Sequence, residues 1–151
     1  MKVEDLRVIG VVGAGVMGSG IAQVFARSGY DVVLVDVSED ILRRALQSIE
    51  SGPYGLIRLV EKGKMSEEEM KKCMQRIKTS TSYESLKDVD FLIECVPENL
   101  ELKRKVFAEL DKICKKEAIF ASNTSGIMIS SLAAAVERKD KFIGMHWFNP
   151  A

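Results

Sequence analysis

Three closely spaced glycines, Gly13, Gly15 and Gly18, follow an apolar run and precede a helix-like run. This pattern is typical of a turn that holds the pyrophosphate of a dinucleotide, because each glycine meets a different steric need. Gly13 allows a tight turn, Gly15 lets backbone N–H groups approach the phosphates, and Gly18 lets the helix pack close to the sheet. The phosphates would lie at the N-terminus of the helix, where N–H groups and the helix dipole stabilise an anion. We therefore predict that this turn binds a cofactor and that the first helical residues, Val16 and Met17, contribute to binding.

Asp36 closes a second apolar run, residues 31–35, at the distance from the glycines that dinucleotide-binding folds use. Its carboxylate can accept hydrogen bonds from ribose hydroxyls, whereas a 2′-phosphate at that place would face a negative charge. The sequence therefore predicts NAD rather than NADP as the cofactor. The neighbouring elements support this reading, because a strand at 7–12 precedes the turn and a helix at about 16–28 follows it, ending before Gly29.

Polar residues also follow the later apolar runs, where a parallel sheet would place its ligand site. These stretches are 96–99, 122–125 and 146–150. The second stretch also fits a helix N-cap, since serine, asparagine and threonine favour that position. His146 is the single histidine of the chain. A lone histidine is more often structural, but its place after a strand predicts a general base that takes a proton from a substrate hydroxyl.

The bulk properties fit one globular domain of 151 residues with 22 basic and 22 acidic side chains. The zero formal charge gives no general attraction to nucleic acid or to an anionic membrane. Three widely spaced cysteines without a CxxC pair argue against a disulfide framework and against a metal site. No apolar run is long enough for a bilayer and the N-terminus lacks a secretory pattern, so we expect a cytoplasmic protein without a membrane partner.

Strand-like and helix-like runs alternate along the chain, which predicts an α/β protein with a Rossmann-type, doubly wound, mainly parallel sheet. The predicted strands are 7–12, 31–35, 91–96, 118–121 and 142–145, with a further candidate at 77–83. The interval from about 39 to 77 is too long for one crossover helix. It predicts a hairpin of two helices, the first at 39–50 and the second opening at a capping box, Ser66 to Glu69. Without a further role this hairpin would be a solvated insertion.

These motifs resemble the L-3-hydroxyacyl-CoA dehydrogenase family over the whole chain. The matching stretches are 11–18, Asp36, 94–100, 121–125 and 144–150, of which the last two are the most specific. The resemblance implies that residues 1–151 form an NAD-binding Rossmann domain. It also implies the oxidation of the 3-hydroxyl of L-3-hydroxyacyl-CoA thioesters by NAD in fatty-acid β-oxidation and related lipid metabolism.

The resemblance also assigns roles to residues. His146 resembles the general base, and Ser125 and Asn149 resemble polar groups around the substrate oxygen and the nicotinamide. Glu98 and Lys103 resemble contacts to the ribose on the nicotinamide side.

In this family the helical hairpin borders the CoA moiety. The serine and lysine that contact CoA fall near two glycines of this chain, so neighbouring residues would have to replace them. Ser51, Lys62 and Lys64 are the candidates, because lysine suits phosphate binding.

Members of the family continue into a C-terminal helical domain, whereas this sequence stops at Ala151. That domain supplies a glutamate partner for the histidine, an asparagine of the substrate site and most of a homodimer interface. The ending directly after the histidine motif favours an excised domain over a naturally short protein. We therefore expect this chain to bind NAD but to catalyse slowly or not at all, because His146 lacks its partner.

Three other functions remain open on the residues alone. A dehydrogenase of a free 3-hydroxyacid would share the glycine turn but would use a lysine from the absent domain. A methyltransferase would bind S-adenosylmethionine at a similar turn, although the spacing and His146 fit it less well. The third alternative is a non-catalytic NAD(H)-binding module.

Overall fold

Six strands form a single sheet in the computed structural model, which describes residues 3–151. The strand order is β3-β2-β1-β4-β5-β6, and every neighbouring pair runs parallel. The strands are β1 (Val8–Val12), β2 (Asp31–Val35), β3 (Ile77–Ser80), β4 (Phe91–Glu94), β5 (Ile119–Ser122) and β6 (Phe142–Gly144). The Rossmann-type prediction is confirmed, and the sheet is wholly rather than mainly parallel.

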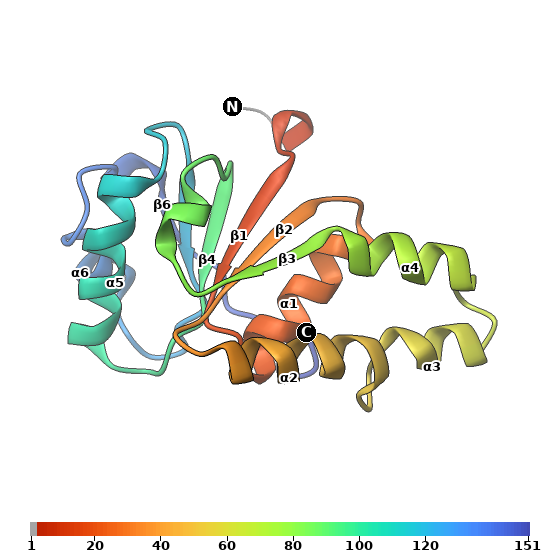
Figure 1. Ribbon diagram of the computed structural model, residues 1–151. Coiled ribbons are helices and arrows are strands. Elements are labelled where there is room, and N and C mark those ends of the chain that lie inside the picture. The colour runs from red at the N-terminus through yellow and green to blue at the C-terminus, as the bar shows by residue number, and fades with distance from the viewer. Residues whose placement is uncertain (1–2) are drawn as a thin grey trace.

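Helices cover both faces of this sheet, as Figure 1 shows. On one face lies α1 (Val16–Arg27), and on the other lie α5 (Leu100–Ile113) and α6 (Ile129–Ala133). Because successive strand residues point to opposite faces, Val11 packs into the core beneath α1 while Val12 packs into the core beneath α5. The central strands β1 and β4 are therefore buried on both sides, which explains their nearly continuous apolar runs.

The hairpin inserted before β3 contains three helices, α2 (Glu39–Ser51), α3 (Leu56–Glu61) and α4 (Glu67–Gln75). Figure 1 shows α3 and α4 projecting beyond the sheet. The predicted capping box is present, since the Ser66 hydroxyl accepts from the Glu69 N–H at 3.1 Å and the Glu69 carboxylate accepts from the Ser66 N–H at 2.7 Å. The prediction of two helices was wrong, because the stretch from Leu56, which is fully buried, forms a helix of its own.

Short 3-10 turns complete the chain at Val3–Asp5, Tyr83–Leu86 and Lys139–Lys141. The predicted end of α1 differs from the observed end by one residue. Within residues 3–151, no helix is both long enough and apolar enough to cross a membrane.

A buried arginine fastens the C-terminal end of α5 to the segment before β6. The guanidinium of Arg138 donates to the Asp111 carboxylate at 2.5 Å and to the carbonyl oxygens of Asp111, Cys114, Lys115 and Ala118. These carbonyls end a helix and the turn after it, so the cation neutralises the negative end of the dipole. Arg138 is thus a structural residue.

Asp90 holds the N-terminal end of β1 through hydrogen bonds to backbone N–H groups. Its carboxylate accepts from the backbone N–H groups of Arg7 at 2.7 Å and Val8 at 2.9 Å, and it pairs with Lys115. Burial alone would raise the pKa of Asp90, but the hydrogen bonds from Lys115, Val8 and Arg7 outweigh it and lower the pKa.

Candidate functional site

The predicted site residues gather along one edge of the sheet, where the parallel strands end. The glycine turn follows β1, Asp36 follows β2, and Ser125 and His146 follow β5 and β6. In open parallel sheets this edge is the place where ligands bind. The topology therefore confirms that these segments share one edge.

The three glycines of the turn have three distinct environments. Gly13 has a φ of +99°, and a Cβ there would lie 2.7 Å from the Cys95 carbonyl oxygen. A Cβ on Gly18 would lie 1.7 Å from the carbonyl oxygen of Gly13, so the helix packs directly against the turn. A Cβ on Gly15 would meet nothing within 4 Å, so this side of the residue faces open space.

The N-terminus of α1 opens into a cleft of about 800 Å³. Its N-cap residue is Gly15, which offers no side-chain hydrogen bond, and no acidic residue occupies the first turn. No acidic side chain of the helix itself therefore competes for the N–H groups and the positive end of the helix dipole. The size of the cleft and the open space at Gly15 fit a dinucleotide.

Asp36 lies on the wall of this cleft and also holds the glycine turn. One carboxylate oxygen accepts from the Ala14 N–H at 2.7 Å, and the other accepts from the Val37 N–H at 2.7 Å. Free lone pairs remain on both oxygens, so ribose hydroxyls can still donate to them. The anchoring of Ala14 is a second role that the sequence analysis did not predict.

Apolar side chains form the rest of the wall near Asp36. Val37 is 85% exposed and Leu102 is 39% exposed, and Ile41 lies with them along the cleft. Exposed apolar groups in a cleft offer contact to a flat ring such as a nucleotide base. The sequence analysis missed these three residues, although Val37 stands next to the predicted Asp36.

Cys95 also lines the cleft, beside the glycine turn. Burial, together with the negative charge of Glu94, raises the pKa of the Cys95 thiol to about 12. The thiol is therefore protonated at neutral pH and is not a nucleophile. Within residues 3–151, no three His, Cys, Asp or Glu side chains are grouped as a metal site.

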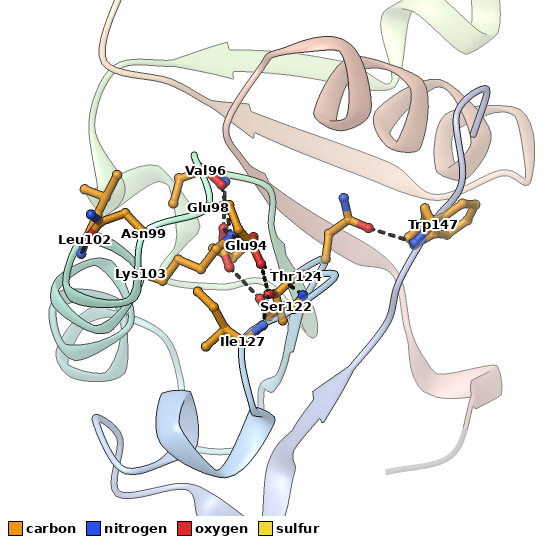
Figure 2. Close-up of polar contacts among 12 residues, drawn as sticks. Glu94, Val96, Glu98, Asn99, Leu102, Lys103, Ser122, Thr124, Ile127 and Trp147 are labelled. Atoms are coloured by element: carbon orange, nitrogen blue, oxygen red, sulfur yellow. Dashed lines mark hydrogen bonds and ion pairs between the residues drawn. The ribbon is translucent and has the colours of Figure 1, made fainter.

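A buried ion pair lies under the segment that follows β4 (Figure 2). The side chains of Glu94 and Lys103 are 0% and 2% exposed. The Lys103 ammonium donates to the Glu94 carboxylate at 2.6 Å and to the Val96 carbonyl oxygen at 2.9 Å. The second oxygen of Glu94 accepts from the Ser122 hydroxyl at 2.6 Å.

Glu98 lies above this pair and is less enclosed, with its side chain 44% exposed. Its Oε1 accepts from the Thr124 hydroxyl and from the Gly126 N–H, while its Oε2 lies 3.5 Å from the Lys103 ammonium. Burial acts to raise the pKa of Glu98, but the hydrogen bonds from Thr124 and Gly126 and the charge of Lys103 lower it. Glu98 is therefore a carboxylate at neutral pH.

Lys103 and Glu98 differ in their access to a ligand. Glu98 keeps an exposed surface, so a contact with a cofactor ribose is open to it. A contact between Lys103 and the cofactor ribose is less accessible, because the Lys103 ammonium is buried and already faces Glu94, Val96 and Glu98.

The three predicted catalytic side chains, Ser125, His146 and Asn149, are exposed to solvent at this edge. The backbone around His146 is fixed on both sides. The Met145 N–H donates to the Ser122 carbonyl oxygen at 2.9 Å, and the Trp147 N–H donates to the side-chain oxygen of Asn123 at 2.7 Å (Figure 2). The sequence analysis assigned no such role to Asn123, which it had grouped with the helix-capping residues.

A second cavity, of about 300 Å³, lies between α1, the start of the hairpin and the C-terminal residues. Its lining carries three cations, Arg27, Arg58 and Lys62, together with Asn149. Lys62 was predicted as a CoA contact, whereas the two arginines were not. Arg58 also pairs with Glu61 at 3.0 Å.

The other two predicted CoA contacts lie elsewhere. Lys64 lines a neighbouring cavity of about 250 Å³ with Arg27, Lys72 and Arg76. The Ser51 hydroxyl is exposed and donates to the Gln47 carbonyl oxygen at 3.0 Å. The structure therefore brings Lys62, but neither Ser51 nor Lys64, next to Asn149.

Comparison with known proteins gives a consistent result. The sequence model described as "3-hydroxyacyl-CoA dehydrogenase, NAD binding domain" matches residues 8–151. The 3-hydroxybutyryl-CoA dehydrogenase of Bradyrhizobium diazoefficiens is 46% identical over 96% of this chain and 48% of its own length. The mitochondrial hydroxyacyl-coenzyme A dehydrogenase of Homo sapiens is 44% identical over 93% of this chain and 46% of its own length.

A solved structure gives the same result in three dimensions. The crystal structure of (S)-3-hydroxybutyryl-CoA dehydrogenase from Ralstonia eutropha superposes with a TM-score of 0.92 at 45% identity. The match covers 97% of this chain and 50% of that chain. The chain thus spans about half the length of these relatives. Its sheet order, glycine turn and cleft agree with the family match, and the chain belongs to the 3-hydroxyacyl-CoA dehydrogenase family, as an NAD-binding domain.

Proposed function

We propose that this chain is the cofactor-binding part of an enzyme that oxidises L-3-hydroxyacyl-CoA to 3-oxoacyl-CoA with NAD. The observation that carries the proposal is the position of His146, which is exposed at the same sheet edge as the dinucleotide cleft. A base at this edge can reach a substrate that lies beside a bound nicotinamide.

In this reaction NAD supplies the acceptor for the hydride that leaves C3 of the substrate. The imidazole of His146 takes the proton of the 3-hydroxyl, so the C3–O bond becomes a carbonyl. Ser125 and Asn149 donate hydrogen bonds toward the substrate oxygen or the nicotinamide carboxamide. The glycine turn and Asp36 hold the other half of the cofactor, which fixes the distance between the two reactants.

The CoA part of the substrate has a suitable place in the second cavity. Arg27, Arg58 and Lys62 provide positive charge for its phosphates, and Asn149 connects this cavity to the catalytic edge. The relatives support the substrate class, since those from Bradyrhizobium diazoefficiens and Ralstonia eutropha are named for 3-hydroxybutyryl-CoA. A relative from Brassica napus, 41% identical, is named for fatty acid β-oxidation.

We further propose that a C-terminal helical domain completes the enzyme, since this chain spans about half of its relatives. That domain would supply the glutamate that pairs with His146, one wall of the substrate site and a homodimer interface. The 151-residue chain alone should then bind NADH but reduce acetoacetyl-CoA slowly or not at all.

The first test is a calorimetric titration of this chain with NADH, NADPH and S-adenosylmethionine. Selective binding of NADH is the expected result, and binding of S-adenosylmethionine alone would overturn the proposal. The catalytic half is tested by joining the chain to the C-terminal half of the Ralstonia eutropha relative and following NADH oxidation by acetoacetyl-CoA. His146→Gln should abolish turnover without changing the NADH affinity. Tight NADH binding without any turnover of the fused protein would favour the non-catalytic NAD(H)-binding module instead.

A further inference from the structure

Five residues form a closed ring of polar contacts (Figure 2). The ring runs from Glu94 at the end of β4 to Lys103 on α5, then to Glu98, to Thr124 and back through Ser122. The Ser122 hydroxyl closes it, since it donates to Glu94 and accepts from the Thr124 N–H at 3.3 Å. The ring therefore joins the segments that follow β4 and β5.

Two members of the ring form a buried ion pair, and the stability of the fold alone does not explain why charged residues occupy these positions. Glu94 and Lys103 are almost fully buried, so their attraction and hydrogen bonds must offset the removal of two charges from water. Apolar residues of similar size are often as stabilising at such places. What the pair offers is direction, because the ammonium lies between the Glu94 carboxylate, the Val96 carbonyl oxygen and Oε2 of Glu98.

Ser125 is held through this ring without being part of it. Its two chain neighbours, Thr124 and Gly126, donate to the same oxygen, Oε1 of Glu98. The other oxygen of Glu98 lies 3.5 Å from the Lys103 ammonium. A shift of Glu98 would therefore release the Gly126 N–H on one side of Ser125 and the Thr124 hydroxyl on the other.

We propose that the buried Glu94–Lys103 pair is a positioning unit that sets the place of Ser125 by holding Glu98 against the turn after β5. Lys103 then acts on the turn that carries Ser125 through Glu98. The role of Ser125 beside the nicotinamide rests on the proposed function, whereas the mechanical link between Lys103 and the turn does not.

The test uses three variants of the 151-residue chain. Lys103→Met removes the cation and leaves Glu94 buried without a partner. Lys112→Met makes the same change on an exposed lysine of the same helix and is the control. The double variant Glu94→Gln/Lys103→Met removes both charges, so it relieves the unpaired charge without restoring the contact to Glu98.

The first readout is amide exchange with water, measured by NMR without any ligand. In Lys103→Met and in the double variant, the Gly126 amide should exchange roughly tenfold faster, as a lost charge-assisted hydrogen bond implies. The Ala14 amide, which is bonded to Asp36, should keep its wild-type rate in the double variant. The double variant should also recover most of the melting temperature that Lys103→Met loses.

The second readout compares two ligands. ADP carries only the half of the cofactor that the glycine turn and Asp36 would hold, whereas NADH also carries the nicotinamide half and reaches the Ser125 side. In the double variant the Kd for NADH should rise roughly tenfold while the Kd for ADP stays within about twofold. A double variant with wild-type Gly126 exchange and a wild-type ratio of the two Kd values would overturn the inference, because the pair would then serve stability alone. If the wild-type chain failed to bind NADH, the proposed function would fail, but the exchange experiment would still decide the mechanical link.

Discussion

Replacing glycine with alanine should lower the stability of the fold at Gly18, whereas at Gly15 it should weaken cofactor binding. At Gly18 the new Cβ would lie 1.7 Å from the Gly13 carbonyl oxygen, where real Cβ contacts essentially never fall below 3.0 Å. The helix and the turn must therefore move apart by more than 1 Å. Overpacking of this kind costs about 1–3 kcal/mol, which lowers the melting temperature of a domain of this size by roughly 2–12 °C.

At Gly15 the same methyl group meets nothing within 4 Å, and the φ of −71° suits alanine. Alanine is a poorer N-cap than glycine, but it also reduces the entropy of the unfolded chain, so the net change should stay within about 1 kcal/mol. The methyl group would project into the space proposed for the pyrophosphate. We therefore expect Gly15→Ala to weaken NADH binding at least tenfold, about 1.4 kcal/mol, with little change in stability.

Differential scanning calorimetry and a fluorescence titration with NADH measure the two quantities on the same preparations. We expect Gly18→Ala to lower the melting temperature without placing a methyl group in the cofactor site. We expect Gly15→Ala to weaken NADH binding without lowering the melting temperature. Equal melting temperatures for wild type and Gly18→Ala would refute the steric argument. Wild-type NADH affinity in Gly15→Ala would refute the placement of the pyrophosphate.

Three further predictions concern charged side chains. Asp36→Ala should raise the Kd for NADH at least tenfold and reduce the preference for NADH over NADPH, since the carboxylate is the proposed acceptor for the ribose hydroxyls. An unchanged ratio of the Kd values for NADH and NADPH would contradict this. Arg138→Met should destabilise the fold by roughly 3 kcal/mol through loss of a buried ion pair, whereas the same change at the more exposed Arg104 should have little effect in thermal melts. Because the pKa of Asp90 is lowered in the fold, its stabilisation is present above its unfolded pKa of about 3.9 and is lost as pH falls through the lower folded value. Melting temperatures should therefore fall less steeply toward pH 2 in Asp90→Asn than in the wild type, and parallel curves would exclude this role.

Most of the sheet was predictable because its central strands are separate apolar runs bounded by polar residues, whereas the edge strand Ile77–Ser80 contains only one apolar residue. The short helices were harder to predict. Leu56–Glu61 follows a Gly- and Pro-containing interval and has too few residues for a periodic pattern, and Ile129–Ala133 is shorter still. Whether these short segments form helices depends on the burial of single residues such as Leu56 and not on local helix propensity.

The position of the glycine turn and Asp36 beside one cleft was also predictable from local spacing, whereas their contacts to the cofactor stay predictions. The second role of Asp36, as an acceptor for the Ala14 N–H, depends on how two strand ends meet in space. Arg58 likewise reaches the cavity beside Asn149 only through the fold. The catalytic roles of His146, Ser125 and Asn149, the homodimer and the cytoplasmic location stay predictions.

The sequence contains an indication of the buried ion pair, namely a charged residue within an apolar strand. The run from Phe91 to Val96 was interpreted as an apolar strand, although it contains Glu94. A carboxylate in a strand that is buried on both faces must find a cation or several donors, since an unpaired charge there is too costly. The following helix offers lysines and arginines, and only Lys103 lies on its buried face with Val106, Phe107 and Leu110. A polar residue that breaks an apolar pattern therefore indicates a tertiary partner, and here that partner leads to the turn that carries Ser125.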